Sequence, residues 1–254
     1  MKITVLGTGT SQGVPVIACN CEVCQSVNPK DKRLRTSVLI TIAGKNYVID
    51  TGPDFRQQML REDVQDLEAI IYTHFHKDHV AGMDDVRAFN FKAKGKAMEI
   101  WADEWVQEAL KREFHYVFEA QKYPGVPRVN LNTVEEQAFS IDGNTFIPIN
   151  VMHYKLPVKA YRIKDFAYVT DANYIAPEEK QKLQNLDVLI LNALRREKHL
   201  SHFNLEEALE LIDELQPKKA YLTHISHYMG LHDEVNQELP DNVEVAYDGL
   251  EIVL

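Results

Sequence analysis

The stretch THFHKDH, residues 73–79, holds the densest group of side chains able to bind a metal. His74 and His76 are two residues apart, so in an extended segment their rings project to the same side. Asp78 and His79 follow after a turn, and the whole group comes directly after the apolar run AIIY. Clustered polar groups at the end of a buried strand need a common partner, and imidazole and carboxylate groups bind zinc and similar cations. We therefore predict a metal site here, with a solvated polar loop as the alternative.

A second group of metal-binding residue types lies near the N-terminus, where Cys19, Cys21 and Cys24 are the only cysteines of the chain. A closed structural zinc site needs four protein ligands, so a fourth must come from elsewhere. The first residues, MKITVLGTG, are too short for a signal peptide, and no stretch approaches a membrane span. We therefore expect a cytoplasmic protein with reduced thiols, in which clustered cysteines bind metal. Free thiols are the alternative.

The composition fits one globular domain over residues 1–254, with 45% hydrophobic and 26% charged residues. The formal net charge of −10 would repel a long polyanion, so nucleic acid is not the expected partner. The basic clusters at 92–96 and 195–198 are short and are interpreted as solvated faces. A small anionic substrate held by a metal is compatible with this charge. The oligomeric state stays open, with a homodimer as the commonest arrangement.

Short strands and a few helices must position these residues. The apolar pattern predicts strands at 3–6, 37–42, 47–50, 69–72, 98–101, 146–151, 161–163, 167–169, 188–191, 220–222, 243–246 and 251–253. It predicts helices near 54–61, 83–92, 103–114, 177–185, 204–215 and 230–238. The helix at 204–215 has the strongest pattern, because Asn204 can cap it and Glu207 completes a capping box. Its apolar face is formed by Leu205, Ala208, Leu209 and Ile212.

Two pairs of segments in the chain have similar sequences. YVIDT at 47–51 is similar to YVTDA at 168–172, and IIYTHFH at 70–76 is similar to AYLTHISH at 220–227. In each half a β-run ends in Asp and a later β-run ends in Thr-His. This order predicts a duplicated β/α unit that delivers polar residues where strands end. Ligand sites in α/β folds often lie at such strand ends.

These motifs carry a resemblance to a known family. The HxHxDH pattern after a β-run resembles the metallo-β-lactamase superfamily of binuclear hydrolases. The stretch HKDHVAGMDDVRAFN at 76–90 is similar to the HxDHxxGxDDxRxFN segment of the PhnP-type phosphodiesterases. So are GTGTSQGVPVIACNCEVC at 7–24, HFNLEEAL at 202–209 and LTHISH at 222–227. The resemblance implies an α/β (α+β) fold of the αββα sandwich type, with two sheets face to face, helices outside and a metal site at one edge.

The resemblance also carries further ligands onto single positions. His153, in INVMHYK, takes the place of the next metal histidine, Asp171 that of the bridging carboxylate, and His224 that of the last ligand. Asp50, in VIDTG, matches an aspartate that orients the site. Taken singly, His153, Asp171 and Asp50 fit capping or strand-end roles, but their order after THFHKDH favours the metal centre. The implied pair of Mn²⁺ or Zn²⁺ ions is bridged by Asp171, with one ion on His74, His76 and His153 and the other on Asp78, His79 and His224.

The same pattern implies a fourth ligand for the cysteines. The segment THISH offers two histidines, and its echo with IIYTH assigns His224 to the active site. In the PhnP-like pattern His227 then joins Cys19, Cys21 and Cys24 in a structural Cys₃His zinc site. Such a site would fasten the N-terminal loop to the strand end that carries His224. The reverse assignment of the two histidines is the alternative.

His202, in SHFNLEEA, resembles the H-x-T/N-x-x-x-A signature of related phosphodiesterases and of RNase Z. There the histidine faces the scissile phosphate, where an imidazolium would stabilise developing charge or protonate the leaving oxygen. The implied activity is hydrolysis of a small phosphodiester, such as a cyclic ribose phosphate, by a metal-bridging hydroxide. The implied catalytic residues are Asp50, Asp78 and His202. The remaining histidines match no motif and are interpreted as surface or structural residues: His115, His199 and His232.

Three rival functions stay open. RNase Z-like tRNA processing shares the His202 signature, but that family carries an arm between the strand histidine and the bridging aspartate. Here only 17 residues, 154–170, separate His153 from Asp171. A thioester or lactam hydrolase is disfavoured by the His202 signature and by DDVRAFN. A PqqB-like metal protein of a cofactor pathway, without hydrolytic turnover, shares the CxCxxC loop, and only an assay separates it from an enzyme.

Overall fold

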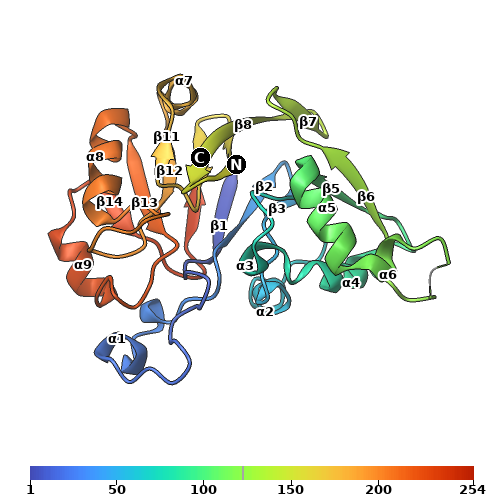
Figure 1. The fold of residues 1–254 in the computed structure, drawn as a ribbon, viewed down its shortest axis with the longest axis horizontal. Coiled ribbons are helices and arrows are strands. Elements are labelled where there is room, and N and C mark those ends of the chain that lie inside the picture. The colour runs from blue at the N-terminus through green and yellow to red at the C-terminus, as the bar shows by residue number, and fades with distance from the viewer. Residues whose placement is uncertain (122) are drawn as a thin grey trace. The chain divides into compact units, whose positions relative to one another are not determined.

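The structure is a computed structural model that describes residues 1–121 and 123–254. Its chain forms two compact units. Unit 1 consists of Met1–Leu6, Ser37–Glu135 and Glu251–Leu254, and unit 2 consists of Gly7–Thr36 and Glu136–Leu250. Each unit is built on one β-sheet with helices in its connections (Figure 1). The expected single domain over residues 1–254 stays a prediction.

Unit 1 contains a seven-stranded sheet in the order β15-β1-β2-β3-β4-β5-β6. The pairs from β3 to β6 are parallel, and such pairs need crossover connections, which here carry the helices. The strands are β1 (Lys2–Gly7), β2 (Ser37–Ile42), β3 (Lys45–Ile49), β4 (Ala69–Ile71), β5 (Met98–Ala102), β6 (Val129–Thr133) and β15 (Glu251–Val253). The helices are α2 (Phe55–Arg61), α3 (Lys77–Val80), η2 (Met83–Val86), α4 (Arg87–Lys92), α5 (Glu104–Glu113) and α6 (His115–Phe118).

Unit 2 contains an eight-stranded sheet in the order β11-β8-β9-β10-β12-β13-β14, with β7 paired to β8. The strands are β7 (Phe139–Ile141), β8 (Asn144–His153), β9 (Leu156–Ile163), β10 (Phe166–Val169), β11 (Tyr174–Ile175), β12 (Val188–Asn192), β13 (Lys219–Thr223) and β14 (Val243–Val245). The helices are α1 (Glu22–Gln25), η1 (Pro29–Asp31), α7 (Pro177–Lys180), η3 (Gln181–Leu183), α8 (Leu205–Leu215) and α9 (His232–Glu238).

The central strands of both units are buried on both faces. All residues of β4, β10 and β12 are buried, as the apolar runs AII, FAYV and VLILN predict for parallel strands covered on two sides. Each unit has its own hydrophobic cluster, around Ile70 and Ile100 in unit 1 and around Leu189 and Leu222 in unit 2. The buried strands give rigid ends from which polar side chains can be positioned.

Helix α8 confirms the expected capping box. The Asn204 side chain accepts a hydrogen bond from the Glu207 backbone N–H (2.9 Å), and the Glu207 carboxylate accepts one from the Asn204 N–H (3.1 Å). The apolar face differs in detail from the expectation. Leu209 is only partly buried, whereas Leu211 and Leu215 are buried, so the packed face of the helix is wider than the four expected positions.

Every strand expected from the sequence is present, with ends that shift by a few residues. Two expected helices, 83–92 and 177–185, each divide into an α-helical and a 3₁₀ segment. The pattern missed the strands β6, β7 and β11. In β6 (VNLNT) no residue is buried, and the alternating pattern holds only two apolar residues, which is too short a signal for a strand. The sequence also missed the short helices α1, α3 and α6.

Four strands of each sheet have the same order and directions. The two similar Thr-His segments, however, do not follow equivalent strands. The order β2-β3-β4-β5 pairs antiparallel, parallel, parallel, and so does β9-β10-β12-β13. Asp50 and Asp171 therefore follow equivalent strands, β3 and β10. His74 follows β4, whereas His224 follows β13, the equivalent of β5. The Thr-His match is thus a local similarity and not an equivalent position of the duplicated unit.

The observed secondary structure confirms the expected α/β class, with two sheets flanked by helices. In the described part of the chain, no helix combines the length and the apolar character that a membrane crossing requires.

We predict that Asn204→Ala lowers the free energy of unfolding by about 1–2 kcal/mol, because the first turn of α8 loses its cap. The Asn204 amide also donates to the Arg196 carbonyl oxygen, so the loss extends to the loop before the helix. Urea denaturation followed by circular dichroism measures the change. Glu206→Ala, which alters an exposed first-turn residue outside the capping box, is the control. Equal midpoints for the two variants would show that the cap contributes nothing.

Candidate metal centres

The THFHKDH segment lies in unit 1, where the chain leaves β4 and enters α3. His74 and His79 are buried, and His76 is half-buried. Asp50 lies at the end of the neighbouring parallel strand β3, so both segments meet at the same edge of the sheet. Gly82 allows α3 to pack there, because a Cβ at this position would lie 2.3 Å from the Gly52 carbonyl oxygen.

The fully buried Asp50 carboxylate is hydrogen-bonded to two residues of this segment. It accepts bonds from the Thr73 N–H (2.8 Å), from the Thr73 hydroxyl (2.7 Å) and from His79 Nδ1 (2.7 Å). Because the Thr73 hydroxyl donates to Asp50, its oxygen is left to accept from His74 Nδ1 at 3.0 Å. The Asp50 network therefore places the proton of both His74 and His79 on Nδ1 and leaves both Nε2 lone pairs for a metal.

Burial raises the pKa of Asp50, and the hydrogen bonds from His79 and Thr73 oppose that effect. The three donors around the carboxylate are what a buried carboxylate requires. Asp50 is therefore placed to orient the ligands rather than to bind the metal itself.

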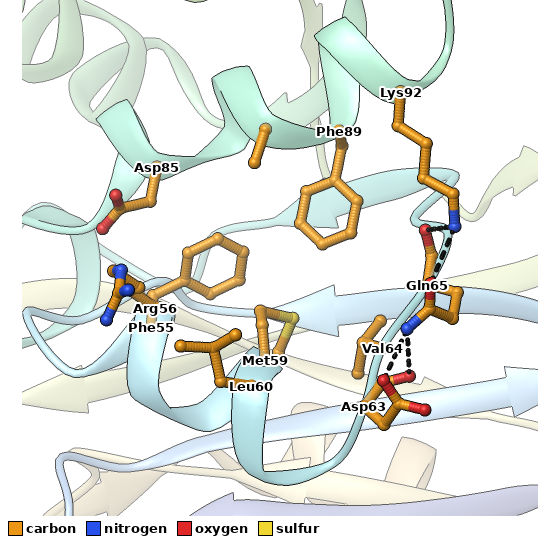
Figure 2. Close-up of a pocket in the computed structure, with 11 residues that line it drawn as sticks. Phe55, Arg56, Met59, Leu60, Asp63, Val64, Gln65, Asp85, Phe89 and Lys92 are labelled. Carbon is orange, nitrogen blue, oxygen red and sulfur yellow. Dashed lines mark hydrogen bonds between the residues drawn. The ribbon is translucent and has the colours of Figure 1, made fainter.

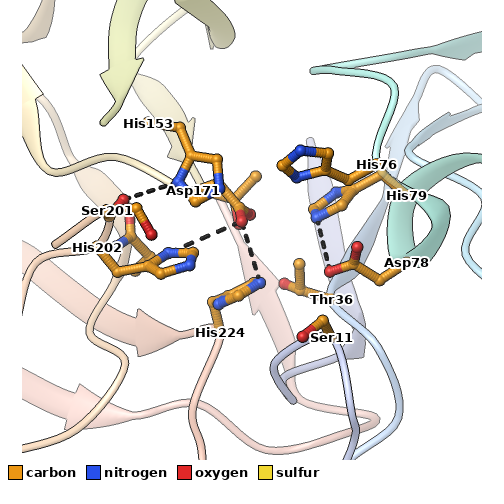
Figure 3. Close-up of polar contacts among 12 residues, drawn as sticks. Ser11, Thr36, His76, Asp78, His79, His153, Asp171, Ser201, His202 and His224 are labelled. Atoms are coloured by element: carbon orange, nitrogen blue, oxygen red, sulfur yellow. Dashed lines mark hydrogen bonds and ion pairs between the residues drawn. The ribbon is translucent and has the colours of Figure 1, made fainter. Parts of the chain in front are cut away.

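The metal-binding atoms of this segment form two close pairs. His79 Nε2 lies 3.2 Å from an Asp78 carboxylate oxygen, and His74 Nε2 lies 3.1 Å from His76 Nδ1. Figure 3 shows the Asp78–His79 pair. Two ligands of one tetrahedral zinc ion, each at about 2.1 Å, are roughly 3.4 Å apart. The spacing in unit 1 therefore fits two cation positions, each with two ligands from this segment.

Unit 2 brings His153, Asp171 and His224 to one edge of its sheet. The strands β8, β10 and β13 run in the same direction, because β8 and β10 are both antiparallel to β9, and β10, β12 and β13 are parallel. The three residues lie at the carboxyl ends of these strands. His224 Nε2 lies 3.3 Å from Asp171 Oδ1, again a spacing suited to two ligands of one cation (Figure 3).

Neighbouring groups orient these ligands. His153 Nδ1 donates to the Ser201 carbonyl oxygen (2.7 Å), which leaves Nε2 as its lone-pair nitrogen. The Thr170 hydroxyl donates to Asp171 Oδ2 (2.7 Å), so Oδ1 faces His224. The turn after Asp171 is fastened by buried Asn192, whose amide makes two hydrogen bonds with the Ala172 backbone.

Three of the predicted residues have left-handed backbone conformations. Asp50, Asp171 and His224 have φ values of 65°, 58° and 56°. Residues other than glycine rarely adopt this region, and such residues cluster at functional sites, where the surrounding structure supports them. In each case the residue follows a buried strand and turns its side chain out of the strand pattern.

His202 lies in the loop before α8, beside the unit 2 ligands. With His153 and Asp171 it forms a group whose ligand atoms lie within 4.8 Å of one another. Its ring stacks on His224 with centroids 4.8 Å apart, and its Nδ1 lies 3.8 Å from Asp171 Oδ1, beyond hydrogen-bonding distance (Figure 3). Within the described residues, this buried Nδ1 has no hydrogen-bond partner.

Burial lowers the pKa of His202 to about 3, although the Asp171 carboxylate acts in the opposite direction. The ring is therefore neutral near pH 7 in the protein alone. The imidazolium role expected from the sequence stays a prediction. A neutral imidazole still donates one N–H to an oxygen of a substrate.

The cysteine group lies entirely within unit 2 and includes His227. His227 Nδ1 is 3.2 Å from Cys19 Sγ, 3.3 Å from Cys21 Sγ and 3.5 Å from Cys24 Sγ. A tetrahedral zinc ion with ordinary Zn–S and Zn–N bonds would separate such atoms by about 3.6 Å. All four ligand atoms lie within 4.8 Å of one another, so the set fits one zinc ion.

Neighbouring groups favour the thiolate form of Cys21 but not that of Cys24. The Cys24 backbone N–H, followed by His227 and the other thiols, lowers the pKa of Cys21 to about 6, whereas burial raises that of Cys24 to about 11. The loop is joined to the His224 segment by a parallel bridge between Gly9 and Ile225, with N–H···O bonds of 3.1 and 2.8 Å. His227, the expected fourth ligand, thus lies two residues beyond a segment that is paired with the N-terminal loop.

Some residues that orient the expected ligands were not predicted from the sequence. Thr73, Ser201 and Asn192 hold ligands in place, and only Thr73 had a signal, as the residue before His74. His199 was interpreted as surface or structural, but its ring lies 5.2 Å from that of His202. His232 is buried, in agreement with a structural role.

A separate cavity of about 370 Å³ lies in unit 1 between α2 and α4 (Figure 2). The rings of Phe55 and Phe89 lie 6.4 Å apart across its apolar part. Its lining contains no histidine or cysteine, so it is not a metal site of the predicted kind. The lining residues are Phe55, Arg56, Met59, Leu60, Asp63, Val64, Gln65, Asp85, Ala88, Phe89 and Lys92.

Comparison with known proteins agrees with this arrangement. The Beta-lactamase superfamily domain matches residues 45–225. The crystal structure of a new diphosphatase from the PhnP family is 39% identical, with a TM-score of 0.93 over 100% of this chain and 97% of that chain. Zn²⁺-bound PqqB from Methylobacterium extorquens has a TM-score of 0.80 over 100% of both chains, but at 16% identity it shows the fold alone.

A curated relative is named octanoyltransferase and comes from Porphyromonas gingivalis (strain ATCC BAA-308 / W83). It is 39% identical over 257 residues, which cover 100% of this chain and 52% of that protein. The chain therefore spans about half the length of this relative.

The fold and its ligand groups define a metal-dependent hydrolase. The chain belongs to the beta-lactamase superfamily and, within it, to the PhnP family. This confirms the resemblance drawn from HxHxDH and HKDHVAGMDDVRAFN.

We predict that Asp50→Asn weakens Mn²⁺ binding by about 10- to 100-fold. The single amide oxygen can replace either Oδ1, which accepts from the Thr73 N–H, or Oδ2, which accepts from the Thr73 hydroxyl and His79, but not both. Mn²⁺ is the useful probe, since thiolate sites disfavour it. Isothermal titration of the metal-free protein measures the affinity. Asp66→Asn, a change of an exposed carboxylate in the same unit, is the control. A folded Asp50→Asn variant with undiminished Mn²⁺ affinity would contradict the orienting role.

We predict that His227→Ala loses the zinc held by the cysteines and has a lower melting temperature. Three thiolates alone leave a tetrahedral ion without its fourth protein ligand. Elemental analysis of the purified variant gives the zinc content. His115→Ala, at an exposed histidine, should retain all of the zinc. Equal zinc content in both variants would mean that His227 is not a ligand.

Proposed function

We propose that this protein hydrolyses a small phosphodiester with two divalent cations. The observation that carries the proposal is the placement of His202. It is a buried imidazole whose Nδ1 makes no hydrogen bond within the described residues, grouped with His153 and Asp171. A buried polar atom without a hydrogen-bond partner destabilises the folded protein. A hydrogen bond from this nitrogen to a bound substrate explains best why it is there.

The proposed ligands are those expected from the sequence, and their joint role in one binuclear centre stays a prediction. Within each unit their spacing and orientation support it. One cation would be held by His74, His76 and His153, the other by Asp78, His79 and His224, with Asp171 shared. Two such cations, Mn²⁺ or Zn²⁺, supply a water of lowered pKa and a clamp for an anionic phosphoryl group.

The residues of the chain provide the remaining functions. Asp50 orients the histidines through Thr73 and His79. His202 donates its N–H to a phosphoryl or leaving-group oxygen and so stabilises charge as it develops. The Cys₃His zinc holds the N-terminal loop on the segment that carries His224 and takes no part in the reaction.

The substrate class follows from the chemistry and from the PhnP relatives. A phosphodiester has two non-bridging oxygens for the cations and one leaving oxygen for His202. Cyclic ribose phosphates are the proposed substrates. The relationship to a PhnP-family diphosphatase favours a second candidate, a diphosphate in which each phosphorus also carries two bridging oxygens. We do not propose acyl transfer, since the relative named octanoyltransferase is nearly twice as long as this chain.

Two alternative functions, RNase Z-like and PqqB-like, fit the residues of this chain less well. The short 154–170 segment, which includes β9 and β10, leaves no room for an RNase Z-like arm. A PqqB-like metal protein without turnover would need neither His202 nor a water of lowered pKa. Cytoplasmic location and a homodimer stay predictions.

Activity is tested with metal-free protein and bis(p-nitrophenyl) phosphate, with and without Mn²⁺. We predict metal-dependent turnover, with a kcat at least about 100-fold lower in His202→Ala, since positioned proton donors contribute about 10²- to 10⁴-fold. His115→Ala is the matched control. Cyclic ribose phosphates and dinucleoside diphosphates then separate the two substrate classes. A folded, metal-loaded protein that cleaves none of these compounds would overturn the proposal.

A further inference from the structure

Tyr154 occupies a strained position next to a proposed metal ligand. The pairing of His153 with Leu156 makes Tyr154 and Lys155 the two-residue loop of the β8–β9 hairpin. Tyr154 has φ of +57°, at a loop position where glycine, asparagine or aspartate is preferred. An aromatic residue in this conformation is costly, and such strain persists where the side chain has a use.

Packing within the folded protein does not explain why a tyrosine occupies this position. Tyr154 is 47% exposed, so nearly half of its surface gains nothing from packing. The Lys155 ammonium lies 5.3 Å from the ring centroid, but exposed cation–π contacts of this kind are weak. The ring therefore offers an open aromatic face at the surface of unit 2.

Hydrogen bonds join the Tyr154 backbone to the loop that carries His202. The Asn173 side chain accepts from the Tyr154 N–H (2.7 Å) and donates to the Leu200 carbonyl oxygen (3.2 Å). His153 itself donates to the Ser201 carbonyl oxygen, the next residue along. Leu200, which precedes His202 by two positions, is 67% exposed. Two exposed apolar side chains thus flank the loops that present the proposed phosphate-binding histidines.

We infer that Tyr154 is a substrate-binding residue that stacks on the nucleobase of a small nucleotide phosphodiester or diphosphate, with Leu200 at the edge of the base. This inference rests on the proposed function, because it places the phosphate at His153 and His202. A planar ring beside a phosphate site fits a base joined to a phosphate through ribose, since every base has a π-face. The net charge of −10 favours a mononucleotide-sized ligand over a polynucleotide.

The test compares ligands that differ only in the base. Calorimetric titration of the Mn²⁺-loaded protein with AMP and with ribose 5-phosphate gives a ratio of dissociation constants. We expect AMP to bind about tenfold more tightly, and Tyr154→Ala to abolish most of this preference. Tyr154→Phe should keep it, because the ring remains. The same ratio is measured in kcat/KM with 2′,3′-cyclic AMP and a base-free cyclic ribose phosphate.

Tyr174→Ala is the matched control. That tyrosine is also exposed, but it lines a separate cavity together with Glu207, Glu210 and other residues. The preference for AMP should persist in this variant. A wild-type protein that binds AMP no better than ribose 5-phosphate, or a Tyr154→Ala variant with the full preference, would overturn the inference. Loss of the preference in Tyr154→Ala, in a protein without turnover, would support base stacking and refute the proposed hydrolysis.

Discussion

The buried carboxylate of Asp50 determines how the histidines of the THFHKDH segment present their nitrogens. Through the Thr73 hydroxyl and His79 Nδ1 it places protons on one side of the His74 and His79 rings. The opposite nitrogens then keep their lone pairs, and that of His79 faces an Asp78 carboxylate oxygen at 3.2 Å. Two acceptors at that distance repel each other unless a cation lies between them. The hydrogen-bond direction inside the protein thus favours the binding of a cation between these two groups.

The sheets explain why such groups meet. In unit 2 the strands β8, β10 and β13 share one direction, so their carboxyl ends deliver His153, Asp171 and His224 to the same edge. The left-handed residues after these strands let a ligand leave the buried strand without a long loop. Short connections between rigid strands keep the ligand atoms close to their required positions, which a mobile loop would not.

Features with a local sequence pattern could be predicted, and features that depend on distant contacts could not. THFHKDH is a local pattern that residue type and spacing alone identify. His153, Asp171 and His224 were proposed from the family resemblance and from their order along the chain, and their joint role stays a prediction. β6 was missed because its alternating sequence VNLNT contains only two apolar residues. Asn192 and His199 escaped because their partners, Ala172 and His202, are brought to them only by the fold. Contacts of this kind leave no periodic trace in the sequence.

The two units share a strand order but differ at equivalent strand ends. Asp50 and Asp171 follow equivalent strands and share a left-handed backbone, yet their environments differ. Asp50 is enclosed by three hydrogen-bond donors, whereas Asp171 holds one hydroxyl and faces His224 with its other oxygen. The same strand-end position therefore places a carboxylate among donors in unit 1 and beside the ring of His224 in unit 2. Three N–H and O–H donors occupy most of the four lone-pair sites of Asp50, which suits an orienting role better than a ligand role.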